Sequence, residues 1–154
     1  MKRRSFLKST LIASAAGAAV TAGILSPNVA FAAAHAGDLT GAKSVEEVMK
    51  LLGAEGATES DKIKIKAPEI AENGAVVPVG ITSEIAGTTE IVSITAANPT
   101  PFAARYTIGE GAEAAVKSRF KMGKTTDVIA VIKADGKYYT AKTNVKVTKG
   151  GCGG

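Results

Sequence analysis

The chain has 154 residues, of which 45% are hydrophobic and 21% charged, and its formal net charge is +5 at pH 7. This length allows one domain of ordinary size. The positive charge is concentrated at the start, in Lys2, Arg3, Arg4 and Lys8. The chain after residue 32 carries only about +1, which gives no indication of a nucleic-acid-binding protein.

The first segment has the features of an export signal. It joins a basic start to an apolar run, Leu11 to Leu25, and ends in the small-residue sequence Ala30-Phe31-Ala32. Arg3 and Arg4, followed by Ser-Phe-Leu-Lys, match the twin-arginine export motif. The apolar run is too rich in Ala, Gly, Ser and Thr for a typical membrane span. We therefore expect residues 1–32 to be a twin-arginine signal peptide that is cleaved at its end.

This signal predicts a periplasmic protein without a membrane anchor. The twin-arginine route exports proteins that are already folded, usually because a cofactor or a partner has joined in the cytoplasm. The sequence offers no cofactor site, so export together with a bound partner is the simpler expectation. The remaining chain, residues 33–154, is long enough for one self-sufficient core.

A short helix is predicted after a loosely attached stretch, residues 33–41. Ser44 and Glu47 have the spacing of a capping box, in which each side chain accepts a backbone N–H of the first turn. Apolar residues follow at helical spacing as far as Leu52. Gly53 is expected to end the helix.

Beyond Gly56 the hydrophobic pattern changes from helical spacing to alternation, which is typical of strands. Asp135-Gly136 is a favoured two-residue hairpin turn, and the runs on either side of it should pair. Turn residues separate seven such runs: 61–68, 75–84, 88–98, 101–109, 114–122, 126–133 and 138–148.

This spacing predicts a mainly β fold, an immunoglobulin-like antiparallel β-sandwich over residues 33–148 with a short N-terminal helix. Pro78 cannot donate a ladder hydrogen bond, so its strand is expected at a sheet edge or a bulge. Lys117, Arg119 and Lys121 share one face of their strand. They are expected to be solvated, or to meet an acidic partner surface.

The end of the chain is a glycine-rich tail, residues 149–154, with the sequence KGGCGG. Val147 is the last residue expected to face the core, so five residues lead from it to Cys152. They allow a reach of about 17 Å at roughly 3.4 Å per residue. The tail glycines leave the backbone free and would not block entry into a narrow channel; they are Gly150, Gly151, Gly153 and Gly154.

Few residues are arranged for catalysis or metal binding. Cys152 is the only cysteine and His35 the only histidine, far apart in the sequence. A Cys-His pair is therefore not expected, and an exposed residue near a chain end is the simpler interpretation of His35. Glu110 and Glu113 have the residue types of an acid/base pair but read more naturally as a solvated loop. No metal or cofactor is expected in this chain.

The leader RRSFLK, the small β-domain and the terminal VKVTKGGCGG together resemble the SoxY family, the sulfur-carrier subunits of the bacterial thiosulfate-oxidising (Sox) system. The resemblance is clearest from Ser118 to Gly154 and weaker over the rest of the chain. It implies that Cys152 carries sulfur intermediates covalently and that the chain is not itself an enzyme.

The resemblance also implies partners. A SoxZ-like β-sandwich subunit would form a heterodimer with this chain and be exported with it. A c-type cytochrome pair, SoxAX, would join thiosulfate to Cys152, and the manganese-dependent hydrolase SoxB would release sulfate. A sulfane dehydrogenase would oxidise the remaining sulfur where it is present. The cofactors belong to these enzymes.

Two other roles for Cys152 stay open. In an exported protein a single cysteine can form a stable disulfide with another chain, which would make this a crosslinked binding module. A thiol oxidoreductase is the weakest alternative, because no second cysteine is present to resolve a mixed disulfide.

Overall fold

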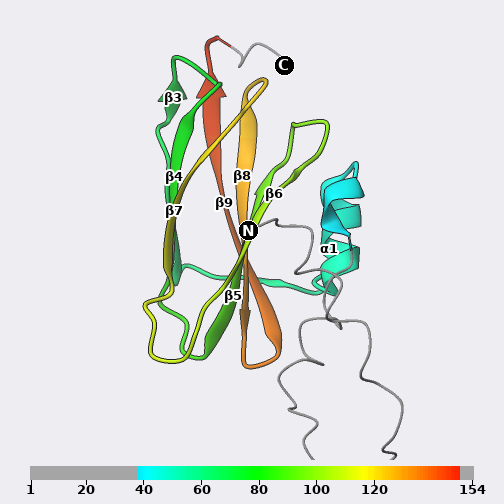
Figure 1. Cartoon of the computed structure of the whole chain (residues 1–154), viewed down its shortest axis with the longest axis vertical. Helices are drawn as coiled ribbons and strands as arrows, with labels where there is room; N and C mark the ends of the chain where they lie inside the picture. Colours follow the sequence, from blue (N-terminus) through cyan, green and yellow to red (C-terminus); the bar gives the residue numbers. More distant parts are fainter. Residues whose placement is uncertain (1–37, 150–154) are drawn as a thin grey trace, which may run out of the picture. The chain divides into compact units, whose positions relative to one another are not determined.

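The computed structural model describes residues 38–149 (Figure 1). Its single α-helix in this range, α1 (Val45–Leu52), is capped at both ends. Ser44 Oγ accepts the backbone N–H of Glu47 at 3.1 Å. Gly53 takes the left-handed conformation, with φ 70°, and its N–H donates to the carbonyl of Lys50 at 3.0 Å. The predicted helix is confirmed; the one difference is that Glu47 Oε2 accepts the N–H of Lys43.

Replacing Ser44 by Ala should lower the free energy of unfolding by about 1 kcal/mol, because the N–H of Glu47 loses its acceptor. Urea denaturation followed by circular dichroism measures the change. Ser44→Asp is the matched control, since its carboxylate can accept the same N–H. Equal denaturation midpoints for the two variants would contradict the assignment of the cap.

The prediction that residues 33–41 are loosely attached is wrong for the end of that stretch. A short 3-10 helix spans Leu39–Gly41, and the side chain of Leu39 is buried. Asp38 caps this turn: its carboxylate accepts the hydroxyl of Thr40, and also the Thr40 N–H at 3.1 Å. These hydrogen bonds lower the pKa of Asp38, the one to the Thr40 hydroxyl most of all.

Two sheets account for the strands of the described residues. The larger sheet has the order β1-β9-β8-β5-β6, and β3 also pairs with β9; the smaller has the order β2-β4-β7. The strands are β1 (Thr58–Glu59), β2 (Ile63–Lys66), β3 (Ile70–Ala71), β4 (Val77–Ser83), β5 (Thr88–Thr95), β6 (Phe102–Thr107), β7 (Ala115–Phe120), β8 (Thr126–Ala134) and β9 (Lys137–Val147).

Each of the seven predicted runs contains a strand, so the mainly β prediction is confirmed. The prediction of purely antiparallel pairing is wrong along the edge of β9, where β1 and β3 both pair in parallel. These two strands were missed because each is only two residues long, too short to show an alternating pattern.

The hairpin of β8 and β9 forms as predicted. Ala134 pairs with Lys137, and the two residues between them, Asp135 and Gly136, have φ values of 48° and 72°. Positive φ at both positions is the requirement of a type I′ turn, which explains the Asp-Gly sequence.

The prediction for Pro78 needs correction. Its strand, β4, is the central strand of the smaller sheet rather than an edge strand. Pairing with β2 stops at Gly80, however, so Pro78 has a ladder partner only on the β7 side, where it lies opposite Arg119. On the β2 side Pro78 therefore lies at a local edge of the sheet, where a residue without an N–H is tolerated.

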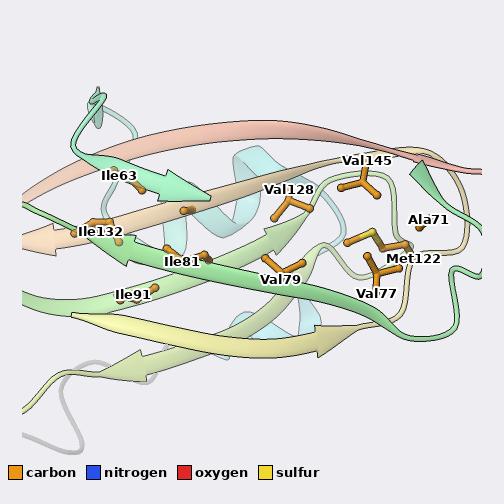
Figure 2. Packing of buried hydrophobic residues seen from close by; sticks show 11 residues of the cluster. Ile63, Ala71, Val77, Val79, Ile81, Ile91, Met122, Val128, Ile132 and Val145 are labelled. Atoms are coloured by element: carbon orange, nitrogen blue, oxygen red, sulfur yellow. The ribbon is translucent and has the colours of Figure 1, made fainter. Parts of the chain in front are cut away.

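The two sheets enclose the main core, and α1 covers the outer face of the larger sheet (Figure 1). The side chains of β8 face two hydrophobic clusters, one on each side of the larger sheet. Val128, Ala130 and Ile132 belong to the cluster between the sheets, and Val131 belongs to the cluster under α1. This burial on both faces explains why β8 is nearly continuously apolar. Figure 2 shows the inter-sheet cluster, with Met122 near the end at which β9 finishes.

Candidate functional site

The end of β9 is held by the last residue of β3 and by the segment that joins β3 to β4. The N–H of Thr148 donates to the carbonyl of Ala71 at 3.1 Å, and its hydroxyl donates to the carbonyl of Glu72 at 3.3 Å. The carbonyl of Lys149, the last described residue, accepts the N–H of Gly74 at 2.8 Å. Backbone hydrogen bonds thus continue for two residues beyond the strand.

Residues 121–125, which join β7 to β8, connect this contact to the core. The carbonyl of Gly74 accepts the N–H of Met122 at 2.7 Å, and the side chain of Met122 is fully buried. Thr125 Oγ1 accepts the N–H of Val147 at 3.0 Å. We call this end of the sandwich, made by residues 69–76, 121–125 and 146–149, the exit end, because the chain leaves the described structure here.

These bonds change the expected reach of the tail. The sequence placed the last anchor at Val147, whereas the structure fixes the backbone as far as Lys149. Three residues lead from Lys149 to Cys152, which allows about 10 Å at roughly 3.4 Å per residue. Gly150, Gly151, Cys152, Gly153 and Gly154 lie outside the described residues, as do Arg3, Arg4 and His35.

The exit end displays exposed apolar and charged side chains, of which the sequence singled out Lys121 but neither of the apolar residues. Ile70 is 57% exposed and Val76 58% exposed. The exposed lysines of this end are Lys121, Lys124, Lys146 and Lys149, and the exposed carboxylates are Glu69 and Glu72. A break in the alternating pattern at Pro-Glu-Ile-Ala was the only sequence signal for Ile70.

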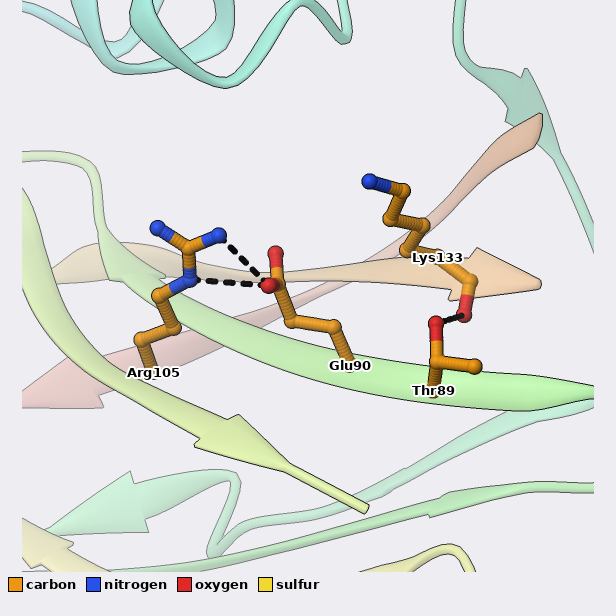
Figure 3. Close-up of polar contacts among 4 residues, drawn as sticks. All are labelled: Thr89, Glu90, Arg105 and Lys133. Atoms are coloured by element: carbon orange, nitrogen blue, oxygen red, sulfur yellow. Dashed lines mark hydrogen bonds and ion pairs between the residues drawn. The ribbon is translucent and has the colours of Figure 1, made fainter. Parts of the chain in front are cut away.

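The acidic pair considered in the sequence analysis lies at the surface. Glu110 and Glu113 are exposed in the loop between β6 and β7, as expected for a solvated loop. Glu90 Oε2 accepts from Arg105 Nε at 2.8 Å and Nη2 at 2.6 Å, a cross-strand ion pair between β5 and β6 (Figure 3). Within residues 38–149 no group of three or more His, Cys, Asp or Glu side chains could hold a metal ion.

The basic face of β7 lies on the outer surface of the smaller sheet. Lys117 and Arg119 are exposed, as predicted, and Lys121 is exposed just beyond the strand. Lys66, Gly80 and Lys117 form one row across the three strands. Because Gly80 has no side chain, a shallow groove of about 670 Å³ follows this row.

Comparison with known protein families gives the assignment. Residues 48–152 match SoxY, described as a sulfur oxidation protein. The chain belongs to the SoxY family. The match runs from α1 through the exit end and includes Cys152, so the resemblance seen in the sequence is confirmed.

A solved structure supports the SoxY assignment. The sulfur carrier protein SoxY from Chlorobium limicola f thiosulfatophilum is 41% identical, with a TM-score of 0.57, over 62% of this chain and 84% of that chain. A superoxide reductase (neelaredoxin) from Ignicoccus hospitalis is 20% identical over 61% of this chain and 89% of that chain, with a TM-score of 0.49. That likeness is too weak to indicate a shared function. No curated protein sequence matches the chain.

The described part of this SoxY-family chain, residues 38–149, has no helix that is long and apolar enough to cross a membrane.

Proposed function

We propose that this SoxY-family chain carries sulfur intermediates covalently on Cys152 during thiosulfate oxidation. The observation that carries the proposal is the family match, which extends through Cys152. The related protein from Chlorobium is itself described as a sulfur carrier. The anchored end of β9 adds support, because it leaves only a short glycine-rich connection between a fixed backbone and the single thiol.

The chemistry begins with the Cys152 thiolate. Its sulfur and the terminal sulfur of thiosulfate form an S–S bond and give up an electron pair, which the c-type cytochrome pair SoxAX accepts. The product is a cysteine S-thiosulfonate. Water, directed by the hydrolase SoxB, then attacks the sulfonate sulfur and breaks the S–S bond to it. Sulfate and protons leave, and a persulfide remains on Cys152.

The tail supplies access rather than catalysis. Gly150, Gly151, Gly153 and Gly154 surround Cys152 with backbone that carries no side chains, so that the sulfur can enter a narrow channel. The enzymes, not this chain, would hold the metal and haem groups. Where a sulfane dehydrogenase is present, it would oxidise the persulfide sulfur and prepare it for a second hydrolysis.

The proposal includes the cellular setting. A SoxZ-like subunit would pair with this chain, and the twin-arginine signal at residues 1–32, with Arg3 and Arg4, would export the heterodimer to the periplasm. The strand orders of the two sheets support an immunoglobulin-like class for the fold. The orders β2-β4-β7 and β9-β8-β5 correspond to A-B-E and G-F-C, the strand orders of the two sheets in an immunoglobulin domain.

The proposal is tested by the mass of the C-terminal peptide from protein exported by its own host. With thiosulfate, Cys152 should carry thiosulfonate or persulfide adducts that disappear on reduction, and Cys152→Ser should carry none. A thiol that is always free would exclude the carrier role. A thiol joined only to another polypeptide would instead support the alternative, a crosslinked binding module.

A further inference from the structure

The limited reach of the tail restricts where an enzyme can bind. From the fixed carbonyl of Lys149, the backbone of Cys152 can extend no further than about 10 Å. The channel of any enzyme that reacts with the sulfur must therefore open within that distance of Lys149. Its outer surface then has to contact the residues of the exit end.

The most exposed apolar side chains of the described residues lie at this end. Three large hydrophobic residues are widely exposed in residues 38–149: Leu51 at 46%, Ile70 at 57% and Val76 at 58%. Ile70 pairs with Lys146 in the ladder of β3 and β9. Val76 is two residues from Gly74, so its Cα lies within about 8 Å of the Cα of Gly74, whose N–H binds Lys149.

The exit end combines the apolar side chains of Ile70 and Val76 with charged residues, as a typical docking surface does. Specific interfaces place apolar side chains at the centre and polar ones at the rim. At the exit end the exposed lysines outnumber the exposed carboxylates, and they are Lys121, Lys124, Lys146 and Lys149 against Glu69 and Glu72. The complementary partner has apolar side chains at the mouth of its channel and an excess of carboxylates around them.

We propose that Ile70 and Val76 form the docking surface for the enzymes that process the Cys152 adduct. The occupant is an enzyme with an apolar channel mouth and an acidic rim, and it binds transiently while the tail enters. This inference rests on the proposed carrier function. It adds which residues of the folded domain the enzymes recognise, apart from the tail itself.

The test is the double variant Ile70→Thr/Val76→Thr, which keeps the β-branched shape and changes polarity. The purified hydrolase SoxB, acting on the thiosulfonate form, should show a kcat/KM reduced at least about tenfold, mainly through a higher KM. Leu51→Gln, a polar change on α1, is the matched control and should leave kcat/KM unchanged. Reaction of the free thiol with a small disulfide reagent should be equal in all three proteins.

The outcomes separate the two proposals. If wild-type protein carries the adduct and the double variant is processed at the wild-type rate, the docking surface is wrong and the carrier function stands. If wild-type protein never carries an adduct, both fail. Should the double variant lose its fold by circular dichroism, Val76→Thr alone decides the question, because Val76 lies outside the strands.

Discussion

Deleting Gly150 and Gly151 should reduce enzymatic loading of Cys152 by thiosulfate at least about 100-fold. The backbone is fixed through Lys149, so the deletion removes two of the three residues of reach and draws the sulfur back by about 7 Å. Misplacing a reacting atom by even about 1 Å can cost a factor of about 100 in rate. Single-turnover loading with purified SoxAX, followed by peptide mass, measures the loss.

The control is the opposite change. Inserting two glycines before Cys152 lengthens the tail, and the entropy cost of doubling a flexible segment is only about 0.6 kcal/mol. Loading should then fall less than about threefold. Both variants should react with a small disulfide reagent at the wild-type rate. If the shortened tail is loaded as fast as the wild type, Lys149 is not the functional anchor.

Replacing Met122 by Ala should have the largest effect on stability, lowering the free energy of unfolding by about 2–5 kcal/mol. Met122 is fully buried, and Figure 2 shows it in the core near Ala71, Val77 and Val145. Truncation removes buried apolar atoms and leaves a cavity between the sheets. Guanidinium denaturation of the domain measures the change.

Met122→Leu distinguishes this cavity from a general effect of substitution. The two side chains are close in volume, so the loss should stay below about 1.5 kcal/mol. A similar loss for both variants would show that the site does not depend on filled volume. The backbone bond from the N–H of Met122 to Gly74 is available in both variants.

Local features of the fold could be predicted from the sequence because each depends on a few neighbouring residues. Ser44 and Gly53 set the ends of α1, and the Asp135-Gly136 pair supplies the positive φ values of a tight turn. The sequence pattern correctly placed Val147 of β9 against the core. Local chemistry and burial agree at these positions, which makes them predictable.

Long-range features could not be predicted in the same way. The position of β4 in the middle of its sheet depends on where β2 stops, and Pro78 alone does not encode that. The parallel pairing of β3 with β9 brings together residues that are far apart in the chain. The burial of Leu39 depends on the helix and sheet that cover it.

Part of the candidate site could likewise be predicted from the sequence, and the rest could not. Cys152 and its glycines stand out in the sequence, but their proposed substrate came only from the family resemblance. The anchoring of Lys149 by Gly74 needed the structure, since it joins the end of β9 to a loop between two other strands. The exposure of Ile70 and Val76 likewise depends on what the fold leaves uncovered.

The hydrogen bonds on the two sides of Gly74 have a consequence for encounter rates. Its N–H binds Lys149 and its carbonyl binds Met122, so a single peptide segment connects the base of the tail to the core. The effective concentration of a group on a flexible tether falls roughly as the −3/2 power of the tether length. A tether of three residues rather than five therefore gives the thiol an effective concentration about twofold higher at points within its reach. Under the proposed carrier function, the shorter arm would favour repeated capture of the thiol by an enzyme that is already bound over collision with distant molecules.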